Sequence, residues 1–168
     1  MRLNLGCGTD HRAGYTNVDL FTRADRVDNI VTLATFDEAS ADEMLASHSL
    51  EHLTYADGRR ALARWWQVLK PGGKLVVIVP DVILNMRLFL EFWDRKDPRL
   101  WDFRAKTIWG NQNHGGELHR WGFDEAHLRE ALESAGFVNV AIRRVQGLDF
   151  DFGTVDGACF EATAWRPA

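Results

Sequence analysis

Cysteine is scarce in this sequence and long apolar runs are absent, and each absence excludes a class of protein. Only two cysteines, Cys7 and Cys159, occur among 168 residues. Two are too few for the disulfide framework of a small secreted domain, so we expect buried thiols in a reducing, cytoplasmic compartment. No apolar run approaches the roughly 18 residues of a membrane-spanning helix, and no signal-like segment opens the chain. The sequence therefore predicts neither membrane insertion nor secretion.

An excess of basic charge is also missing. Lys and Arg total 20 against 24 Asp and Glu, which leaves a net charge of -4. Such a protein has no overall attraction to phosphate backbones or anionic membranes, so we expect a small-molecule partner rather than nucleic acid. The length and a hydrophobic content of 46% suit one ordinary domain with a sizeable core. We therefore predict that residues 1–168 form a single domain.

Apolar strand patterns alternate with helical patterns along the chain. We expect strands at 3–5, 16–20, 29–33, 43–47, 74–79, 138–142 and 160–164, and helices at 57–69, 82–94 and 124–135. The helix at 82–94 is apolar nearly all round, which predicts that it is buried. Strands separated by helices predict a three-layer α/β sandwich with a mostly parallel sheet. The last two strands have no room for a helix between them and predict a hairpin-like edge.

A glycine turn follows the first strand, and an acid ends the second. In a doubly wound sheet, ligands bind where such strands end, and Gly6 and Gly8 let the backbone approach a ligand closely. Asp19, nearby, is suited to accept hydrogen bonds from a ribose diol. A dinucleotide fingerprint needs a third glycine, but that position holds His11. These residues favour a cofactor with a ribose and no phosphate, with a plain turn and a capping acid as the alternative.

The order and type of several motifs resemble class I S-adenosylmethionine-dependent methyltransferases, in particular small bacterial ones of the type 11 group. The motifs are Leu3-Asn4-Leu5-Gly6-Cys7-Gly8, Val18-Asp19-Leu20, Ala46-Ser47-His48-Ser49-Leu50-Glu51-His52-Leu53, Leu69-Lys70-Pro71-Gly72-Gly73-Lys74-Leu75, His119-Arg120-Trp121-Gly122-Phe123 and Ser134-Ala135-Gly136-Phe137. The resemblance covers almost the whole chain. It implies a Rossmann-like sheet of seven strands with the last antiparallel, S-adenosylmethionine as cofactor and S-adenosylhomocysteine as product.

The resemblance also implies a role for each matching position. The cofactor-binding residues it implies are Leu5, Gly6, Cys7, Gly8, Asp19, Leu20, Thr32, Leu33, Ser47 and His48. The glycines pass beneath the methionine part, Asp19 binds the ribose, and Leu20 and the adenine-side loop at 29–36 face the adenine. Relatives have a helix before the first strand and a longer path from Gly8 to Asp19. We therefore expect an open cofactor pocket or cover from a partner chain, as in a homo-oligomer.

Histidines and a long connecting segment are candidates for the chemistry. We predict His48, at a strand end near the cofactor, and His119 as catalytic residues, because imidazole is the natural base near neutral pH. Residues 95–122 are too long for a plain connection and predict an acceptor-binding lid with His114, His119 and Trp121 as substrate contacts. No metal is expected, since His114 and His119 lack helical spacing and an obvious third ligand.

Three functions are compatible with these features. The first is methyl transfer from S-adenosylmethionine to an O or N atom of a small polar acceptor, for which the amides, imidazoles and indoles of the lid suggest a sugar or glycan precursor. The second is a non-catalytic nucleoside-binding partner protein. The third, an RNA methyltransferase, is disfavoured by the net charge of -4.

Overall fold

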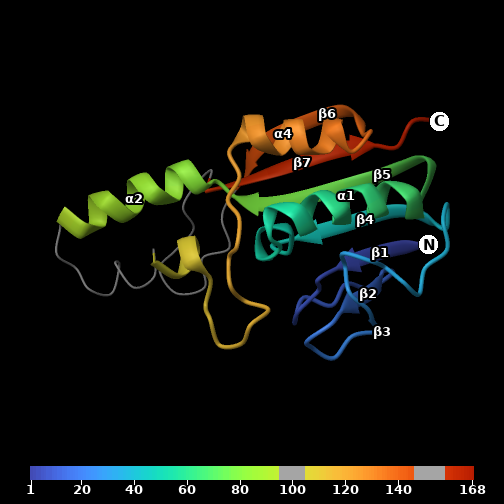
Figure 1. Ribbon diagram of the computed structural model, residues 1–168, viewed down its shortest axis with the longest axis horizontal. Coiled ribbons are helices and arrows are strands. Elements are labelled where there is room, and N and C mark those ends of the chain that lie inside the picture. Colours follow the sequence, from blue (N-terminus) through green and yellow to red (C-terminus); the bar gives the residue numbers. More distant parts are fainter. Residues whose placement is uncertain (95–104, 146–157) are drawn as a thin grey trace.

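The computed structural model describes residues 1–94, 105–145 and 158–168, which form an α/β fold around one sheet. Its seven strands lie in the order β3-β2-β1-β4-β5-β7-β6 (Figure 1). The strands are β1 Arg2–Leu5, β2 Thr16–Asp19, β3 Arg26–Val27, β4 Ala41–Ser47, β5 Leu69–Pro80, β6 Val138–Val145 and β7 Cys159–Trp165. All pairs from β3 to β5 are parallel, and β7 runs antiparallel to both β5 and β6. The predicted fold class, including the antiparallel last strand, is confirmed.

Two capped helices pack together on one face of the sheet (Figure 1). Helix α1, Tyr55–Val68, begins at Thr54, whose side chain accepts a hydrogen bond from Asp57 N. Helix α4, Glu125–Ser134, begins in the same way at Asp124. Along β5, fully buried residues alternate with half-buried ones, so the face away from these helices is less completely covered. The antiparallel pairing of β6 with β7 confirms the predicted final pair, although 146–157 lie outside the described residues.

The strand predicted at 29–33 is wrong, because the third strand is the short β3 and residues 28–36 form a loop. The buried carboxylate of Asp28 organises this loop by accepting hydrogen bonds from the backbone N–H groups of Asn29, Ala34 and Thr35. A side chain that binds local backbone in this way competes with strand pairing. The apolar residues that suggested a strand instead anchor the loop: Leu33 is buried, and Ile30 O accepts a hydrogen bond of 2.7 Å from Trp65 Nε1.

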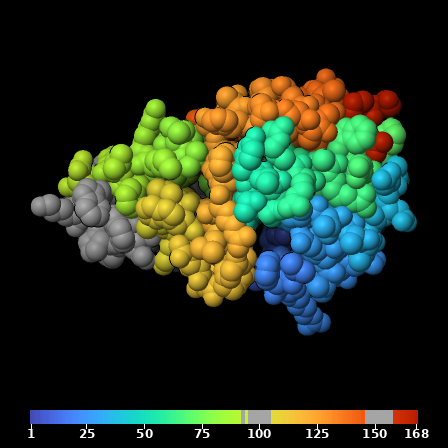
Figure 2. Space-filling model, in the orientation of Figure 1, coloured from blue at the N-terminus to red at the C-terminus, as the bar shows by residue number. Residues whose placement is uncertain are grey.

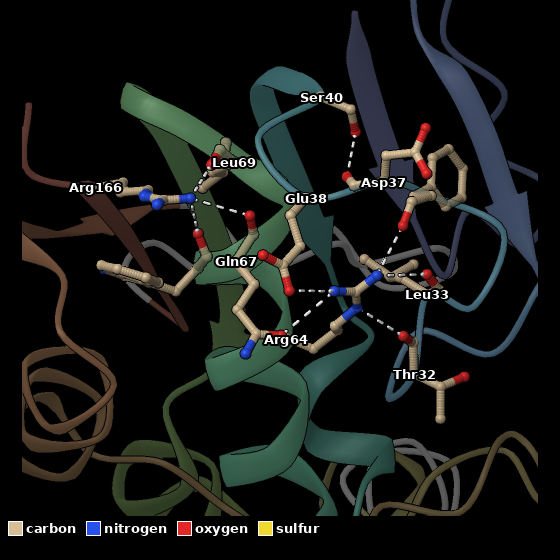
Figure 3. A network of polar contacts seen from close by, with 11 residues as sticks. Thr32, Leu33, Asp37, Glu38, Ser40, Arg64, Gln67, Leu69 and Arg166 are labelled. Atoms are coloured by element: carbon tan, nitrogen blue, oxygen red, sulfur yellow. Dashed lines mark hydrogen bonds and ion pairs between the residues drawn. The ribbon is translucent and has the colours of Figure 1, made fainter.

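Arg64 on α1 holds the same loop from its other side (Figure 3). Its guanidinium donates to the backbone carbonyls of Thr32, Leu33 and Phe36, at 2.9, 3.3 and 2.7 Å. Arg166, near the end of the chain, secures the end of α1 through three further carbonyls. The 28–36 loop is therefore clamped between a carboxylate and a guanidinium although it has no regular structure.

Helix α2, Val82–Asp94, has the predicted bounds but not the predicted burial. Its apolar side chains Ile83, Met86 and Leu90 are 43%, 45% and 63% exposed. The helix is anchored at its first turn, where the amide of Asn85 donates to the carbonyls of Asp81 and Ala158. Beyond that turn it points away from the sheet (Figure 1), so an apolar pattern on every side does not make it a core helix here. No helix of the described residues is long and apolar enough to cross a membrane.

Candidate functional site

The carboxyl ends of β1, β2 and β4 meet at one edge of the sheet and border a cleft of about 580 Å³. This is where an open parallel sheet is expected to bind ligands. Figure 2 shows the hollow where the blue N-terminal part, the teal start of α1 and the orange stretch after residue 110 come together. The residues that line it are Gly6, Gly8, Thr9, Asp19, Leu20, Phe21, Thr22, Asn29, Ile30, Val31, Thr32, His48, Ser49, His52, Leu53, Asp57, Arg60, His114, Gly115, Gly116, Glu117 and Arg120.

The glycine turn forms the floor of this cleft. The N–H of Gly6 donates to Val18 O at 2.8 Å, which fixes the turn against β2. Gly6 has φ +65°, and a Cβ built on it would lie only 2.6 Å from the Cβ of Ser49. Gly8 has φ +51° with open space around it. A side chain at Gly6 would therefore be strained and in collision, whereas one at Gly8 would be strained only.

Asp19, at the end of β2, lies beside the glycine turn and faces the cleft. Its Oδ2 accepts the N–H of Gly8 at 2.9 Å, and its Oδ1 accepts those of Phe21 and Thr22 at 2.7 and 2.9 Å. Burial raises the pKa of Asp19, but these hydrogen bonds outweigh burial and lower it overall. The carboxylate is therefore ionised near neutral pH, as binding a ribose diol requires, and the adjacent Leu20 is half exposed at the cleft wall.

Four of the predicted cofactor residues lie behind the cleft and do not line it. Leu5 and Leu33 are fully buried in the core, and Ser47 is half-buried at the end of β4. Cys7 is also buried, and its burial raises the pKa of the thiol to about 11. Thr32, by contrast, stands on the cleft wall in the loop that Asp28 and Arg64 hold.

His48 lies where β4 ends, in the left-handed region at φ +51°. Its Nδ1 is 3.4 Å from Glu51 Oε1, and its Nε2 is 4.0 Å from Cys159 Sγ. Burial disfavours the charged ring, yet the contacts with Cys159 and Glu51 prevail and raise the pKa of His48 to about 10. Both ring nitrogens are thus engaged with neighbours, and a ring that holds its proton donates hydrogen bonds rather than accepting a proton.

Glu51 is the residue of this site that the sequence interpretation missed. It lies in the short 3-10 helix η1, Leu50–His52, and its side chain is 2% exposed. Its backbone carbonyl accepts the N–H groups of Arg120 and Trp121 at 2.8 and 3.1 Å, so it joins the sheet edge to the predicted lid. The adjacent pair Glu51-His52 in the motif was the available signal, but nothing in the sequence shows that a surface-type residue is buried there.

Three histidines surround the Glu51 carboxylate. Burial raises the pKa of Glu51, but contact with His48 and the charges of His52 and His119 lower it overall. Burial lowers the pKa of His119 below its ordinary value. The rings of His52 and His119 meet edge to face with centroids 4.7 Å apart. The tertiary structure therefore gathers the predicted catalytic residues His48 and His119 around one buried acid.

The described part of the predicted lid, 105–122, borders the cleft with only some of its residues. His114 lines the cleft and stacks near Phe21, with ring centroids 5.6 Å apart. His119 lies deeper, in an adjoining cavity of about 20 Å³ that Glu51 also lines. Trp121 does not line the cleft and packs on Tyr55 instead, at 4.9 Å between centroids. Residues 95–104 of that lid lie outside the described residues.

One family model and several solved structures match this chain. Residues 3–77 match the family model described as a methyltransferase domain. A Thermotoga maritima S-adenosylmethionine-dependent methyltransferase, described as a possible histamine N-methyltransferase, is 17% identical, with a TM-score of 0.66 over 98% of this chain and 81% of that one. A Methanosarcina mazei S-adenosylmethionine-dependent methyltransferase is also 17% identical, with a TM-score of 0.66 over 99% of this chain and 92% of that one.

A third similar structure contains the product form of the cofactor. It is the Burkholderia thailandensis 1,6-didemethyltoxoflavin-N1-methyltransferase with its acceptor and S-adenosylhomocysteine bound, 19% identical, with a TM-score of 0.61 over 99% of this chain and 71% of that one. At these identities the similar structures establish a shared fold. Among curated proteins, none matches this chain.

Proposed function

We propose that this chain is a class I S-adenosylmethionine-dependent methyltransferase and that it methylates an O or N atom of a small polar acceptor such as a sugar. The match of residues 3–77 to a methyltransferase domain, and the fold shared with enzymes of that class, support the proposal. The observation that carries this proposal is the single cleft that joins the glycine turn and Asp19 to the polar residues of the lid. The alternative is a non-catalytic nucleoside-binding protein, which would bind the cofactor and transfer no methyl group.

The cleft suits the cofactor in size and in chemistry. Its volume of about 580 Å³ falls in the usual range for small-molecule sites. Asp19 presents an ionised carboxylate to the cleft, and Gly6 keeps the floor clear where a Cβ would collide. When bound, S-adenosylmethionine supplies a methyl group on a sulfonium that is already activated for displacement. The residues of the chain therefore have to align the acceptor and exclude water.

We propose that the lid and the end of β4 bind the acceptor. His114 and the neighbouring glycines border the same cleft as Asp19. Both ring nitrogens of His48 are engaged, so we propose that His48 positions the β4 end through Glu51 and Cys159. An acceptor hydroxyl has to lose a proton when its oxygen is methylated. We assign this task to Glu51, His52 and His119 together, which we call the Glu51 cluster.

A methyl-transfer screen with labelled cofactor tests this proposal. The protein is incubated with fractions of a metabolite extract and, in a parallel arm, with total RNA of the same source. We expect label in small polar metabolites, and the NMR chemical shift of the transferred methyl group in the purified product distinguishes O-methyl from N-methyl products. Label confined to RNA would contradict the proposed acceptor class, and steep weakening of binding by salt would accompany that result.

A further inference from the structure

The Glu51 cluster contains a buried carboxylate whose hydrogen-bonding capacity is not used. Within the described residues, neither Oε1 nor Oε2 of Glu51 has a hydrogen-bond partner. Glu51 Oε1 forms an ion pair with His48 Nδ1, at 3.4 Å. A buried carboxylate normally has several donors or coordinates a cation, because its desolvation is costly. We therefore expect the two oxygens of Glu51 to have a further positively charged partner.

Two imidazoles lie close to this carboxylate. The ligand atoms of Glu51, His52 and His119 all lie within 4.8 Å of one another. His52 Nδ1 is 3.2 Å from the carbonyl oxygen of Leu118, so Nδ1 must donate, and the Nε2 lone pair is left for a metal. The ring of His119 is hydrogen-bonded to the backbone of Thr107. Metal-binding histidines usually have one ring nitrogen anchored in this way.

A small cavity borders two of these three residues, Glu51 and His119. The adjoining cavity of about 20 Å³, lined by Glu51 and His119, is large enough for a water-sized species. Tetrahedral zinc sites, with bonds of about 2.0–2.2 Å, place their N and O ligand atoms roughly 3.3 Å apart. Metal binding would require the side chains of Glu51 and the two histidines to rotate until their ligand atoms, which lie within 4.8 Å of one another, reach that spacing. His52 also lines the main cleft, so an ion held here would be reached from the acceptor side.

We propose that Glu51, His52 and His119 bind a divalent first-row transition metal ion at the junction of the lid and the sheet. Two imidazoles and one carboxylate favour Zn²⁺, Mn²⁺, Fe²⁺ or Co²⁺ over Mg²⁺ and Ca²⁺, which prefer all-oxygen sites. Three protein ligands leave at least one coordination position open. In the sequence, the nearest candidate ligand to His119 is His114. The fold instead brings His119 close to Glu51 and His52, and His52 is 67 positions away in the chain.

An open position beside the cleft gives the ion a use that rests on the proposed function. An acceptor hydroxyl oxygen bound there would have its pKa lowered and release its proton to solvent. With the ion in place, the Glu51 cluster would therefore promote loss of the proton through the ion and would not accept the proton itself. That oxygen then forms the bond to the methyl carbon as the carbon–sulfur bond breaks. The electron pair of the broken bond remains on sulfur, which leaves as neutral S-adenosylhomocysteine.

Metal titration of the whole protein tests the site without any acceptor. Protein stripped with EDTA is titrated with Co²⁺, followed by visible absorption, and with Zn²⁺ and Mn²⁺ by calorimetry. We expect one equivalent to bind, and Glu51→Gln and His119→Gln each to weaken binding roughly tenfold or more. His127→Gln is the matched control, because His127 is 71% exposed and lies outside the cluster. Thermal unfolding of each variant shows whether it remains folded.

Two results would overturn the site: no uptake of any of the three ions at millimolar concentration, or uptake that both cluster variants retain. The first would mean that Glu51 serves as the counter-ion of His48 alone. Stoichiometric uptake that needs Glu51 and His119 supports the site whether or not the extract screen finds an acceptor. Failure of the proposed acceptor class and failure of the metal site are therefore read from separate measurements.

Discussion

Replacing Asp19 by Asn tests the cofactor site most directly. The carboxylate accepts three backbone N–H groups, from Gly8, Phe21 and Thr22, and still faces the cleft. An amide has one oxygen, so at least one of these donors would face an NH₂ group, which costs about 1–3 kcal/mol of folding stability. Losing one charge-assisted hydrogen bond to the ribose costs about 1.5–3 kcal/mol, or roughly tenfold to hundredfold in Kd.

Calorimetry with S-adenosylhomocysteine and urea unfolding measure the two effects of Asp19→Asn. The matched control is Asp10→Asn, since the Asp10 side chain is 60% exposed and outside the cleft. The pKa of Asp19 is lowered on folding, so its stabilising effect is complete above the ordinary carboxyl pKa and is lost as pH falls through the lowered value. Between about pH 5 and 3, wild-type stability should fall more steeply than that of the variant. Cofactor affinity within twofold of wild type in folded Asp19→Asn would refute the ribose assignment.

Three further predictions concern the residues that shape the cleft. Gly6→Ala should lower the free energy of unfolding by about 1–2 kcal/mol through backbone strain and by about 1–3 kcal/mol more through the collision with Ser49. Gly72→Ala, at φ +75° in open space, should show the strain alone. Equal losses of stability in urea unfolding would contradict this difference. Arg64→Ala should release the 28–36 loop and raise the Kd for S-adenosylhomocysteine severalfold, and hydrogen exchange that stays unchanged in that loop would count against the clamp. Cys7, with a pKa of about 11, should resist iodoacetamide at pH 8 until the protein unfolds, as mass spectrometry of its peptide would report; rapid labelling in the folded state would disprove its burial.

The local sequence pattern was sufficient to predict an element when the residues of that element alone determine its structure. The strand at 74–79 is apolar on both faces, and helix α4 has its capping Asp124 in the sequence, so both form where predicted. The loop at 28–36 was mistaken for a strand because its apolar residues would be buried in a loop as well as in a strand. The carboxylate oxygens of Asp28, which accept hydrogen bonds, and the guanidinium of Arg64, which donates them, hold this segment as a loop. Arg64 belongs to a helix that is distant in the sequence.

The same distinction applies to the site. Gly6, Gly8 and Asp19 could be predicted because strand ends and turns are local features, and parallel pairing of β1 with β2 brings them together. The exposure of helix α2 could not be predicted, because it depends on whether other parts of the chain pack against Ile83, Met86 and Leu90.

The sequence by itself determined the fold class and the glycine turn with its acid, because both depend on residue spacing over short stretches of chain. Only the tertiary structure decided the partners of Glu51. Its burial, and its approach by His52 and by His119 from the lid, depend on long-range packing that places residues 67 positions apart within 4.8 Å. A charged residue reveals its environment only when the chain has closed around it, because the cost of desolvation depends on all its neighbours.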